Sequence, residues 1–330
     1  MDRLRLGVIG AGRMGRSHCR VYANLRHAEL IGVHDQSLHS GHAVAETNQV
    51  NFFESLDGLD GLIAAVDAVS IATPTPTHFD LAMHCIERGV HVLIEKPITQ
   101  TLEQAEKLVQ AAKDSNLVVQ VGHIERFNPA YRELKHVVDG TMMLAVDLRR
   151  LSPFRGSNTD VDVVLDLMIH DIDLALDLAG AIPINIAAQG ITAHNGPIDY
   201  AAAQLQFANG LFLTMTASRM TEQKVRMVEV TAPDAYITAD LLSKSVSVYR
   251  STIGERMENS SRGEKYRQEN IVERIHVPTS EPLHLELQDF VECVMNEQAP
   301  QVTAQHGLDA LRLAEDIRNA ILPNLIRREI

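Results

Sequence analysis

The sequence begins with a short apolar run, Leu6–Ile9, that stops at the glycine-rich segment Gly10-Ala11-Gly12-Arg13-Met14-Gly15. This segment matches G-x-G-x-x-G and leads into a stretch with helical character, Met14–Asn24. When this motif lies between a strand and a helix, the first glycine permits a tight turn and the second lets the backbone approach a pyrophosphate. The third lets the helix pack closely on the strand. Free N–H groups at the start of the helix face the phosphates. The segment predicts a dinucleotide site that includes Gly10, Gly12, Arg13, Met14 and Gly15.

An acidic residue follows the second apolar run, Glu29–His34. Asp35 lies twenty residues beyond Gly15, where a carboxylate accepts hydrogen bonds from ribose hydroxyls. The next four residues, Gln36-Ser37-Leu38-His39, include no arginine or lysine that could pair with a 2′-phosphate. NAD is therefore favoured over NADP. The alternative is that the glycines only form a turn and that Asp35 caps the next helix.

Apolar runs and helical stretches continue to alternate up to Gly122. The runs are Asp67–Ala72, His91–Ile94 and Leu117–Val121, separated by the helical stretch Thr77–Arg88 and by a helix that opens with a capping box at Thr101–Gln104. Strands that are apolar throughout and are joined by helices form parallel sheets covered on both faces. We therefore predict an α/β fold with a Rossmann doubly wound parallel sheet over residues 1–122.

The pattern changes after Gly122. Asn128-Pro129 starts a helix that ends at Gly140, and a second helix is predicted over Val163–Leu178. The strand-like runs that follow are Ile184–Ile191, Tyr200–Phe207, Leu211–Thr216, Val225–Thr231, Tyr236–Asp240 and Val246–Tyr249, with a hairpin at Asn209-Gly210. An exposed loop over Ser251–Asn270 and closing helices over Pro282–Gln298 and Gln305–Leu322 complete the chain. Residues 123–330 are predicted to form an α+β domain with an open, mainly antiparallel sheet.

Composition excludes several classes of protein. The 330 residues include 30 Lys+Arg and 43 Asp+Glu, and the net charge of −13 argues against nucleic acid or an anionic membrane as partner. No apolar run approaches the roughly 18–20 residues that span a bilayer. The three cysteines are widely spaced and form no CxxC pair, so we expect no zinc knuckle and no disulfide framework. A reducing, cytoplasmic location is expected.

Lys96 follows the strand His91–Ile94 within Glu95-Lys96-Pro97. Because ligands of open α/β sheets bind at the carboxyl ends of the strands, an ammonium here points toward a bound nicotinamide. It could hydrogen-bond a substrate hydroxyl and stabilise the alkoxide that precedes hydride loss. The alternative is a solvated lysine at a strand end.

Asp166 and His170 are spaced i and i+4 on the predicted helix, so one carboxylate could orient one imidazole. A neutral imidazole can take a proton from a hydroxyl. A surface pair in an acidic helix is the main alternative. A metal site is disfavoured because no HExxH or CxxC supplies a third ligand, and we expect no bound metal.

Two further segments are notable. Thr73-Pro74-Thr75-Pro76-Thr77-His78 follows a strand and is predicted to be a rigid loop over the crevice, or else a simple turn. Arg149, Arg150 and Arg155 form a basic cluster in an acidic chain. That cluster could hold a substrate phosphate, or it could be solvated or paired with Asp160 and Asp162.

Four segments together resemble the Gfo/Idh/MocA oxidoreductases: GAGRMG at 10–15, ATPTPTH at 72–78, EKP at 95–97 and D-x-x-x-H at 166–170. The resemblance covers essentially the whole chain. It implies an NAD-dependent oxidoreductase acting on CH–OH groups, with Lys96, Asp166 and His170 as the catalytic group. It also implies that Asp35 binds the adenosine ribose. The residues implied on the nicotinamide side are Thr73, Pro74, His78, Glu95 and Lys96.

The segments Val121–Pro129 and Ile169–Asp173 are similar to one branch of this family, which oxidises the C3 hydroxyl of UDP-N-acetylglucosamine in the synthesis of amino sugars for lipid A or related surface glycans. This likeness implies that His170, held by Asp166, accepts the hydroxyl proton while Lys96 polarises the same oxygen. Family members differ on which of the two is the formal base. Arg155 is implied as a partner for the UDP diphosphate, and a homodimer or homotetramer is implied through the C-terminal sheet.

Two alternatives remain. One is a dehydrogenase of a free sugar, an inositol or a UDP-uronic acid. The other, from a different functional class, is an NAD-sensing regulator that has lost catalysis. Such regulators can dispense with the lysine and the Asp/His pair, and this chain keeps both.

Overall fold

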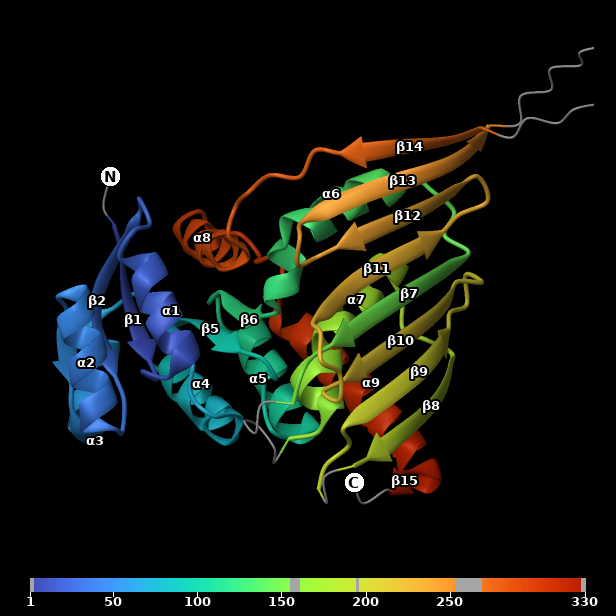
Figure 1. Cartoon of the computed structure of the whole chain (residues 1–330). Helices are drawn as coiled ribbons and strands as arrows, with labels where there is room; N and C mark the ends of the chain where they lie inside the picture. The colour runs from blue at the N-terminus through green and yellow to red at the C-terminus, as the bar shows by residue number, and fades with distance from the viewer. Residues whose placement is uncertain (1–2, 155–160, 194–195, 253–268, 328–330) are drawn as a thin grey trace, which may run out of the picture. The chain divides into compact units, whose positions relative to one another are not determined.

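The computed structural model describes residues 3–154, 161–193, 196–252 and 269–327 (Figure 1). The chain divides into two compact units. Unit 1 comprises residues 1–127 and 280–313, and unit 2 comprises residues 128–279 and 314–330. The expected single boundary after Gly122 therefore differs from the observed division, because residues 280–313 pack with the N-terminal part of the chain.

Unit 1 contains a six-stranded parallel sheet in the order β3-β2-β1-β4-β5-β6. Its strands are β1 (Leu4–Ile9), β2 (Ala28–His34), β3 (Asn51–Phe53), β4 (Ala68–Ile71), β5 (His91–Glu95) and β6 (Val119–Gly122). The chain crosses from the β1–β3 half to the β4–β6 half between neighbouring strands β1 and β4, which is the switch point where doubly wound sheets bind ligands. The predicted Rossmann sheet is confirmed.

Unit 1 also contains helices and short 3-10 turns. The helices are α1 (Arg13–Tyr22), α2 (Leu38–Asn48), α3 (Ser55–Ala65), α4 (His78–Glu87), α5 (Leu102–Asp114) and α8 (Pro282–Met295), with 3-10 turns η1 (Thr75–Thr77) and η2 (Ile124–Phe127). The capping box predicted at Thr101 and Gln104 is present at the start of α5. The sequence analysis did not predict α2, β3 and α3, and β3 is only three residues long.

Residues 280–313 join unit 1 through an apolar core and a backbone pairing. Leu287 and Phe290 of α8 lie in one buried cluster with Cys19 and Tyr22 of α1. The N–H of Val121 in β6 donates to the carbonyl of Val302 at 3.0 Å. Such contacts join segments that are distant in sequence, and no local pattern reports them.

Unit 2 contains a nine-stranded sheet in the order β14-β13-β12-β11-β7-β10-β9-β8-β15. Its elements are α6 (Pro129–Val138), β7 (Ala145–Leu151), a π-helical turn η3 (Val164–Met168), α7 (Ile169–Ala179), β8 (Asn185–Thr192), β9 (Tyr200–Gln206), β10 (Phe212–Ser218), β11 (Val225–Thr231), β12 (Ala235–Asp240), β13 (Ser245–Thr252), β14 (Glu269–Ile275), η4 (Leu322–Asn324) and β15 (Ile326–Arg327). Helix α9 (Ala304–Ile321) begins in unit 1 and ends in unit 2.

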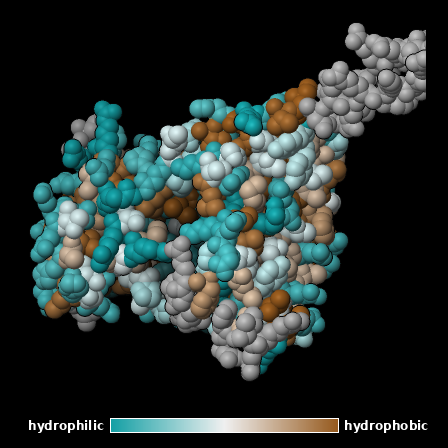
Figure 2. Space-filling model, viewed as in Figure 1, coloured by the Kyte–Doolittle hydropathy of each residue, from teal (hydrophilic) through white to brown (hydrophobic). Residues whose placement is uncertain are grey.

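The sheet of unit 2 is mainly antiparallel, as predicted, and among the strand pairs of the described residues only β7–β10 and β8–β15 are parallel. The hairpin at Asn209-Gly210 joins β9 to β10, with Gly210 at φ +86°. Apolar and hydrophilic residues are interspersed on the visible surface of this unit (Figure 2). Among the described residues, no helix is both long and apolar enough to cross a membrane.

The structure of unit 2 differs from the sequence analysis in three places. The predicted helix over Val163–Leu178 begins instead as the π turn η3 and becomes α-helical only at Ile169. Strand β7 was not predicted, because its charged residues at 147, 149 and 150 obscure the alternation of buried Val146 and Leu148. The predicted loop over Ser251–Asn270 has its ends in β13 and β14, and its remainder, residues 253–268, lies outside the described residues.

Candidate active site

The three glycines of the loop between β1 and α1 serve three different steric needs. Gly10 has φ +104°, and a Cβ there would lie 2.6 Å from the carbonyl oxygen of Ala72. A Cβ on Gly15 would lie 1.7 Å from the carbonyl oxygen of Gly10, so the loop closes only with glycine at this position. A Cβ on Gly12 would meet no protein atom within 4 Å. Gly12 therefore faces open space, which leaves room for a ligand to approach its backbone.

Helix α1 begins at this open position without a side-chain cap. Gly12 is its N-cap residue, no side chain accepts a hydrogen bond from the first turn, and no acidic residue lies in that turn. The first N–H groups of a helix have no intrahelical acceptor, and the helix dipole adds positive potential there. This end of α1 is suited to bind an anionic group such as a pyrophosphate.

Asp35 fixes the loop after β2 against the glycine loop. Its Oδ2 accepts a hydrogen bond from the N–H of Ala11 at 2.6 Å, and its Oδ1 accepts one from the N–H of Ser37 at 2.6 Å. The cap of α2 is Ser37, whose hydroxyl accepts from the N–H of Ser40 at 3.3 Å. The alternative in which Asp35 caps that helix is therefore wrong. The carboxylate lies beside the glycine loop, as the NAD interpretation requires.

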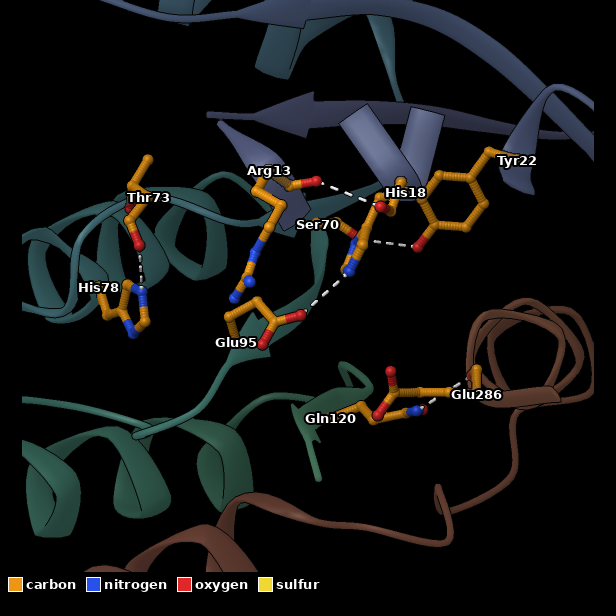
Figure 3. Close-up of polar contacts among 10 residues, drawn as sticks. Arg13, His18, Tyr22, Ser70, Thr73, His78, Glu95, Gln120 and Glu286 are labelled. Atoms are coloured by element: carbon orange, nitrogen blue, oxygen red, sulfur yellow. Dashed lines mark hydrogen bonds and ion pairs between the residues drawn. The ribbon is translucent and has the colours of Figure 1, made fainter. Parts of the chain in front are cut away.

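The loops after β4 and β5 are tied together by His78, the first residue of α4. Its Nδ1 lies 2.9 Å from the carbonyl oxygen of Pro97. Its Nε2 lies 2.9 Å from the carbonyl oxygen of Thr73, the contact drawn in Figure 3. The imidazole is only 1% exposed. His78 therefore joins the loop at Thr73–Pro74 to the loop that carries Lys96. Lys96 is half-buried and precedes a cis peptide bond to Pro97.

Glu95, the last residue of β5, is paired with a histidine that the sequence patterns did not single out. His18 of α1 is fully buried, and its Nε2 lies 3.1 Å from Oε1 of Glu95 (Figure 3). One turn further along α1, the hydroxyl of Tyr22 lies 2.6 Å from Oγ of Ser70 in β4. The i, i+4 spacing of His18 and Tyr22 on a helix that follows the glycine loop was the available signal.

The charge of Glu95 follows from its surroundings. Burial on its own raises the pKa of a carboxyl group, and Glu95 is buried. The hydrogen bond and charge of His18 oppose this effect, as do the positive charges of Lys96 and His78, and the pKa of Glu95 lies below its ordinary value. Glu95 is therefore a buried anion at the carboxyl end of β5.

Asp166 and His170 lie in unit 2, at the junction of η3 and α7. Asp166 is in the π turn and His170 in the first turn of α7, and both side chains are half-buried. The turn starts at Asp162, whose Oδ1 accepts hydrogen bonds from the N–H groups of Val164 and Leu165, each at 3.0 Å. Single π turns occur often at functional sites. The α-helical i, i+4 geometry expected for Asp166 and His170 is replaced here by a π-to-α junction.

The basic cluster predicted around Arg149 is dispersed by the pleat of β7. Arg150 is buried and pairs with Asp171 at 2.7 Å, whereas Arg149 points to the opposite face and pairs with Glu229 at 3.0 Å. Asp162 pairs instead with Arg318 of α9 at 2.7 Å. Arg155 and Asp160 lie outside the described residues. Arg149 and Arg150 therefore do not form a joint phosphate site.

Comparison with known proteins identifies the family. Residues 4–123 match the model of the Gfo/Idh/MocA oxidoreductase family, NAD-binding Rossmann fold, and residues 156–322 match its C-terminal alpha/beta domain. The chain belongs to this family. It is accordingly an oxidoreductase with an NAD-binding Rossmann domain, as the sequence motifs predicted.

Three relatives are informative. UDP-N-acetylglucosamine 3-dehydrogenase of Acidithiobacillus ferrooxidans is 38% identical over 254 residues, which are 77% of this chain and 79% of that protein. A solved structure of the same enzyme from that organism has a TM-score of 0.87 at 33% identity and covers 97% of this chain and 98% of its own. The scyllo-inositol 2-dehydrogenase (NAD(+)) of Bacillus subtilis is 28% identical over 324 residues, which are 91% of this chain and 89% of that protein.

Proposed function

We propose that this chain is an NAD-dependent dehydrogenase that oxidises the C3 hydroxyl of UDP-N-acetylglucosamine to a ketone. The observation that carries the substrate assignment is the likeness to UDP-N-acetylglucosamine 3-dehydrogenase, at 38% identity in sequence and a TM-score of 0.87 in structure. Because an inositol dehydrogenase is also similar, at 28% identity, a free polyol is the second candidate substrate.

The residues of unit 1 fit a dinucleotide. The open position at Gly12 and the uncapped start of α1 would hold the pyrophosphate, with Arg13, Met14 and Gly15 in the same turn. Asp35, already oriented by the backbone of Ala11, would accept hydrogen bonds from the adenosine ribose. The loops that His78 joins, together with Thr73, Pro74, Glu95 and Lys96, would line the nicotinamide side. Bound NAD supplies the hydride acceptor.

The remaining chemistry is proton transfer from the substrate hydroxyl. We assign His170 as the group whose imidazole nitrogen takes this proton, with Asp166 orienting the ring, and Lys96 as the ammonium that hydrogen-bonds the same oxygen. Lys96 belongs to unit 1, and Asp166 and His170 belong to unit 2. Arg155 is assigned to the UDP diphosphate.

We also propose that the chain forms a homodimer or homotetramer through the sheet of unit 2. The register places Phe212, Ala145, Thr231, Tyr236 and Tyr249 in one row across five neighbouring strands. Phe212, Tyr236 and Tyr249 are 37–40% exposed, and the two tyrosine rings lie 5.9 Å apart. A second copy would cover these aromatic rings. Replacing Phe212 and Tyr236 with lysine is expected to lower the molar mass measured by light scattering.

The direct test is NADH formation with a panel of UDP-sugars, free sugars and inositols. Turnover of UDP-N-acetylglucosamine with formation of its 3-keto product supports the proposal. Turnover of free sugars or inositols without any UDP-sugar assigns the second candidate. Tight NAD binding with no turnover of any polyol would assign the chain to the non-catalytic regulators.

A further inference from the structure

The pairing of His18 with Glu95 joins the two parts of the coenzyme site in unit 1. His18 lies on the helix that begins at the glycine loop, and Glu95 immediately precedes Lys96. Their 3.1 Å contact is buried, with His18 side-chain exposure at 0% and that of Glu95 at 12%. The carboxylate is therefore held at a set position relative to both the phosphate-binding turn and the lysine.

The carboxylate of Glu95 also packs against the neighbouring strand. Gly122 of β6 pairs with Glu95 in the sheet, and a Cβ on Gly122 would lie 3.3 Å from Oε2. The carboxylate thus packs over the bare backbone of β6, with Oε1 on His18. The hydrogen bond to His18 and the packing against Gly122 place the negative charge beside β6.

In the contact between His18 and Glu95, Nε2 of His18 donates the hydrogen bond and Oε1 of Glu95 accepts it. Within the described residues, Nδ1 of His18 is buried and has no hydrogen-bond partner, so a hydrogen on Nε2 that is donated to Oε1 of Glu95 satisfies the contact. That donation stabilises the ionised carboxylate in a place where burial alone would favour the neutral acid. The ordinary alternative is that the pair only fixes α1 on the sheet.

A buried carboxylate interacts differently with the oxidised and the reduced form of a nicotinamide coenzyme. The oxidised ring carries a positive charge and the reduced ring is neutral, so an adjacent carboxylate stabilises the oxidised form more. The ammonium of Lys96 acts in the opposite sense, and without Glu95 it would repel the oxidised ring. In a partly buried site, one unit charge several ångströms away is worth about a tenfold change in a binding constant.

We propose that Glu95 is the counter-charge that lets this site bind oxidised coenzyme beside the ammonium of Lys96, and that His18 is a positioning residue acting through Glu95. This inference rests on the proposed function, because it requires the nicotinamide to lie at the carboxyl end of β5. It adds two residues, one from the phosphate-binding helix, that set the preference between NAD+ and NADH.

The test compares the dissociation constants of NAD+ and NADH, measured by calorimetry and by NADH fluorescence without substrate. Glu95→Gln keeps the shape of the side chain and is expected to lower the preference for NAD+ over NADH about tenfold. Tyr22→Phe removes a buried hydroxyl one turn further along α1 and leaves Glu95 in place, so its NAD+ to NADH ratio is expected to match wild type. Equal weakening of both coenzymes by Glu95→Gln, or no change, overturns the proposal.

The role of His18 is tested by two further variants. His18→Leu removes the donor and is expected to lower the same ratio, whereas His18→Gln retains an N–H donor and is expected to restore it. Equal loss of both coenzymes in His18→Leu assigns His18 a structural role only. If His18→Leu does not fold, a lowered ratio in His18→Gln contradicts the assignment. Wild-type protein that binds neither coenzyme would contradict the proposed function itself, which keeps the two failures distinct.

Discussion

Arg150 and Asp171 form an ion pair at 2.7 Å in which the side chains are 1% and 4% exposed. Both Nε and Nη2 of Arg150 donate to Oδ1 of Asp171, at 2.9 and 2.7 Å. Because Asp171 follows His170 directly, this pair anchors the first turn of α7 to strand β7. The proposed proton acceptor is thus held by a buried electrostatic contact at the neighbouring residue.

Removal of one partner of this pair is expected to destabilise the protein strongly. Asp171→Ala removes the carboxylate that pairs with the buried guanidinium of Arg150. The free energy of unfolding is expected to fall by about 3–5 kcal/mol. Urea denaturation measures the change. Arg149→Ala is the matched control on the same strand, because its pair with Glu229 is 43% exposed on the arginine side and should contribute about 1 kcal/mol or less. Similar losses for the two variants would contradict this account.

The glycine loop allows a sharper separation of stability from binding. Gly12→Ala places a methyl group in open space, so thermal unfolding should change little while NAD affinity falls. Gly15→Ala places a methyl group 1.7 Å from the carbonyl oxygen of Gly10 and should lower the stability by more than about 2 kcal/mol. Calorimetric unfolding and NAD titration of both variants decide the matter. Gly12→Ala with unchanged NAD affinity would place the pyrophosphate elsewhere.

Lys96 and His170 are expected to act on the substrate oxygen. Lys96→Ala and His170→Ala should each lower kcat by about 10²- to 10⁴-fold, because each removes a group that handles the hydroxyl proton or its charge. The dissociation constant of NAD should change far less. Steady-state kinetics combined with fluorescence titration of the coenzyme separates the two effects. Parallel losses of kcat and NAD affinity would show that the reacting centre is misassigned.

A pH-dependent contribution to stability is expected from Arg5 and Asp67, which lie 2.6 Å apart. The hydrogen bond from Arg5 lowers the pKa of the Asp67 carboxyl below its ordinary value. A lowered folded-state pKa stabilises the protein at pH above the unfolded value, about 3.9, and the gain disappears as pH falls through the folded value. Wild type should therefore exceed Arg5→Ala in Tm at pH 7, with the difference shrinking as pH falls below about 3.9. If the Tm difference between wild type and Arg5→Ala grows as the pH falls, the pairing of Arg5 with Asp67 is contradicted.

Much of unit 1 followed from local patterns. The apolar runs predicted β1, β2, β4, β5 and β6 to within a few residues. The glycine spacing located the tight turn between β1 and α1, since only a residue without Cβ tolerates the contacts at Gly10 and Gly15. These features depend on chain neighbours or on a fixed period, and a sequence records both directly.

Other features were invisible for identifiable reasons. The alternation in β7 was masked because Arg150 is buried through its pair with Asp171 and so looks like a surface residue in the sequence. The packing of Phe290 with Tyr22 joins residues that are far apart in the chain. The contact of His18 with Glu95 likewise depends on how α1 lies against β5.

Local sequence patterns were enough to predict most strands of the parallel sheet and the glycine turn, because these follow from steric limits and periodicity. Only the tertiary structure decided that Asp35 binds the glycine loop, that His18 holds Glu95, that Arg149 and Arg150 point apart, and that Asp166 lies in a π turn. Burial and long-range pairing set the charge and orientation of these side chains, and neither is encoded in neighbouring residues.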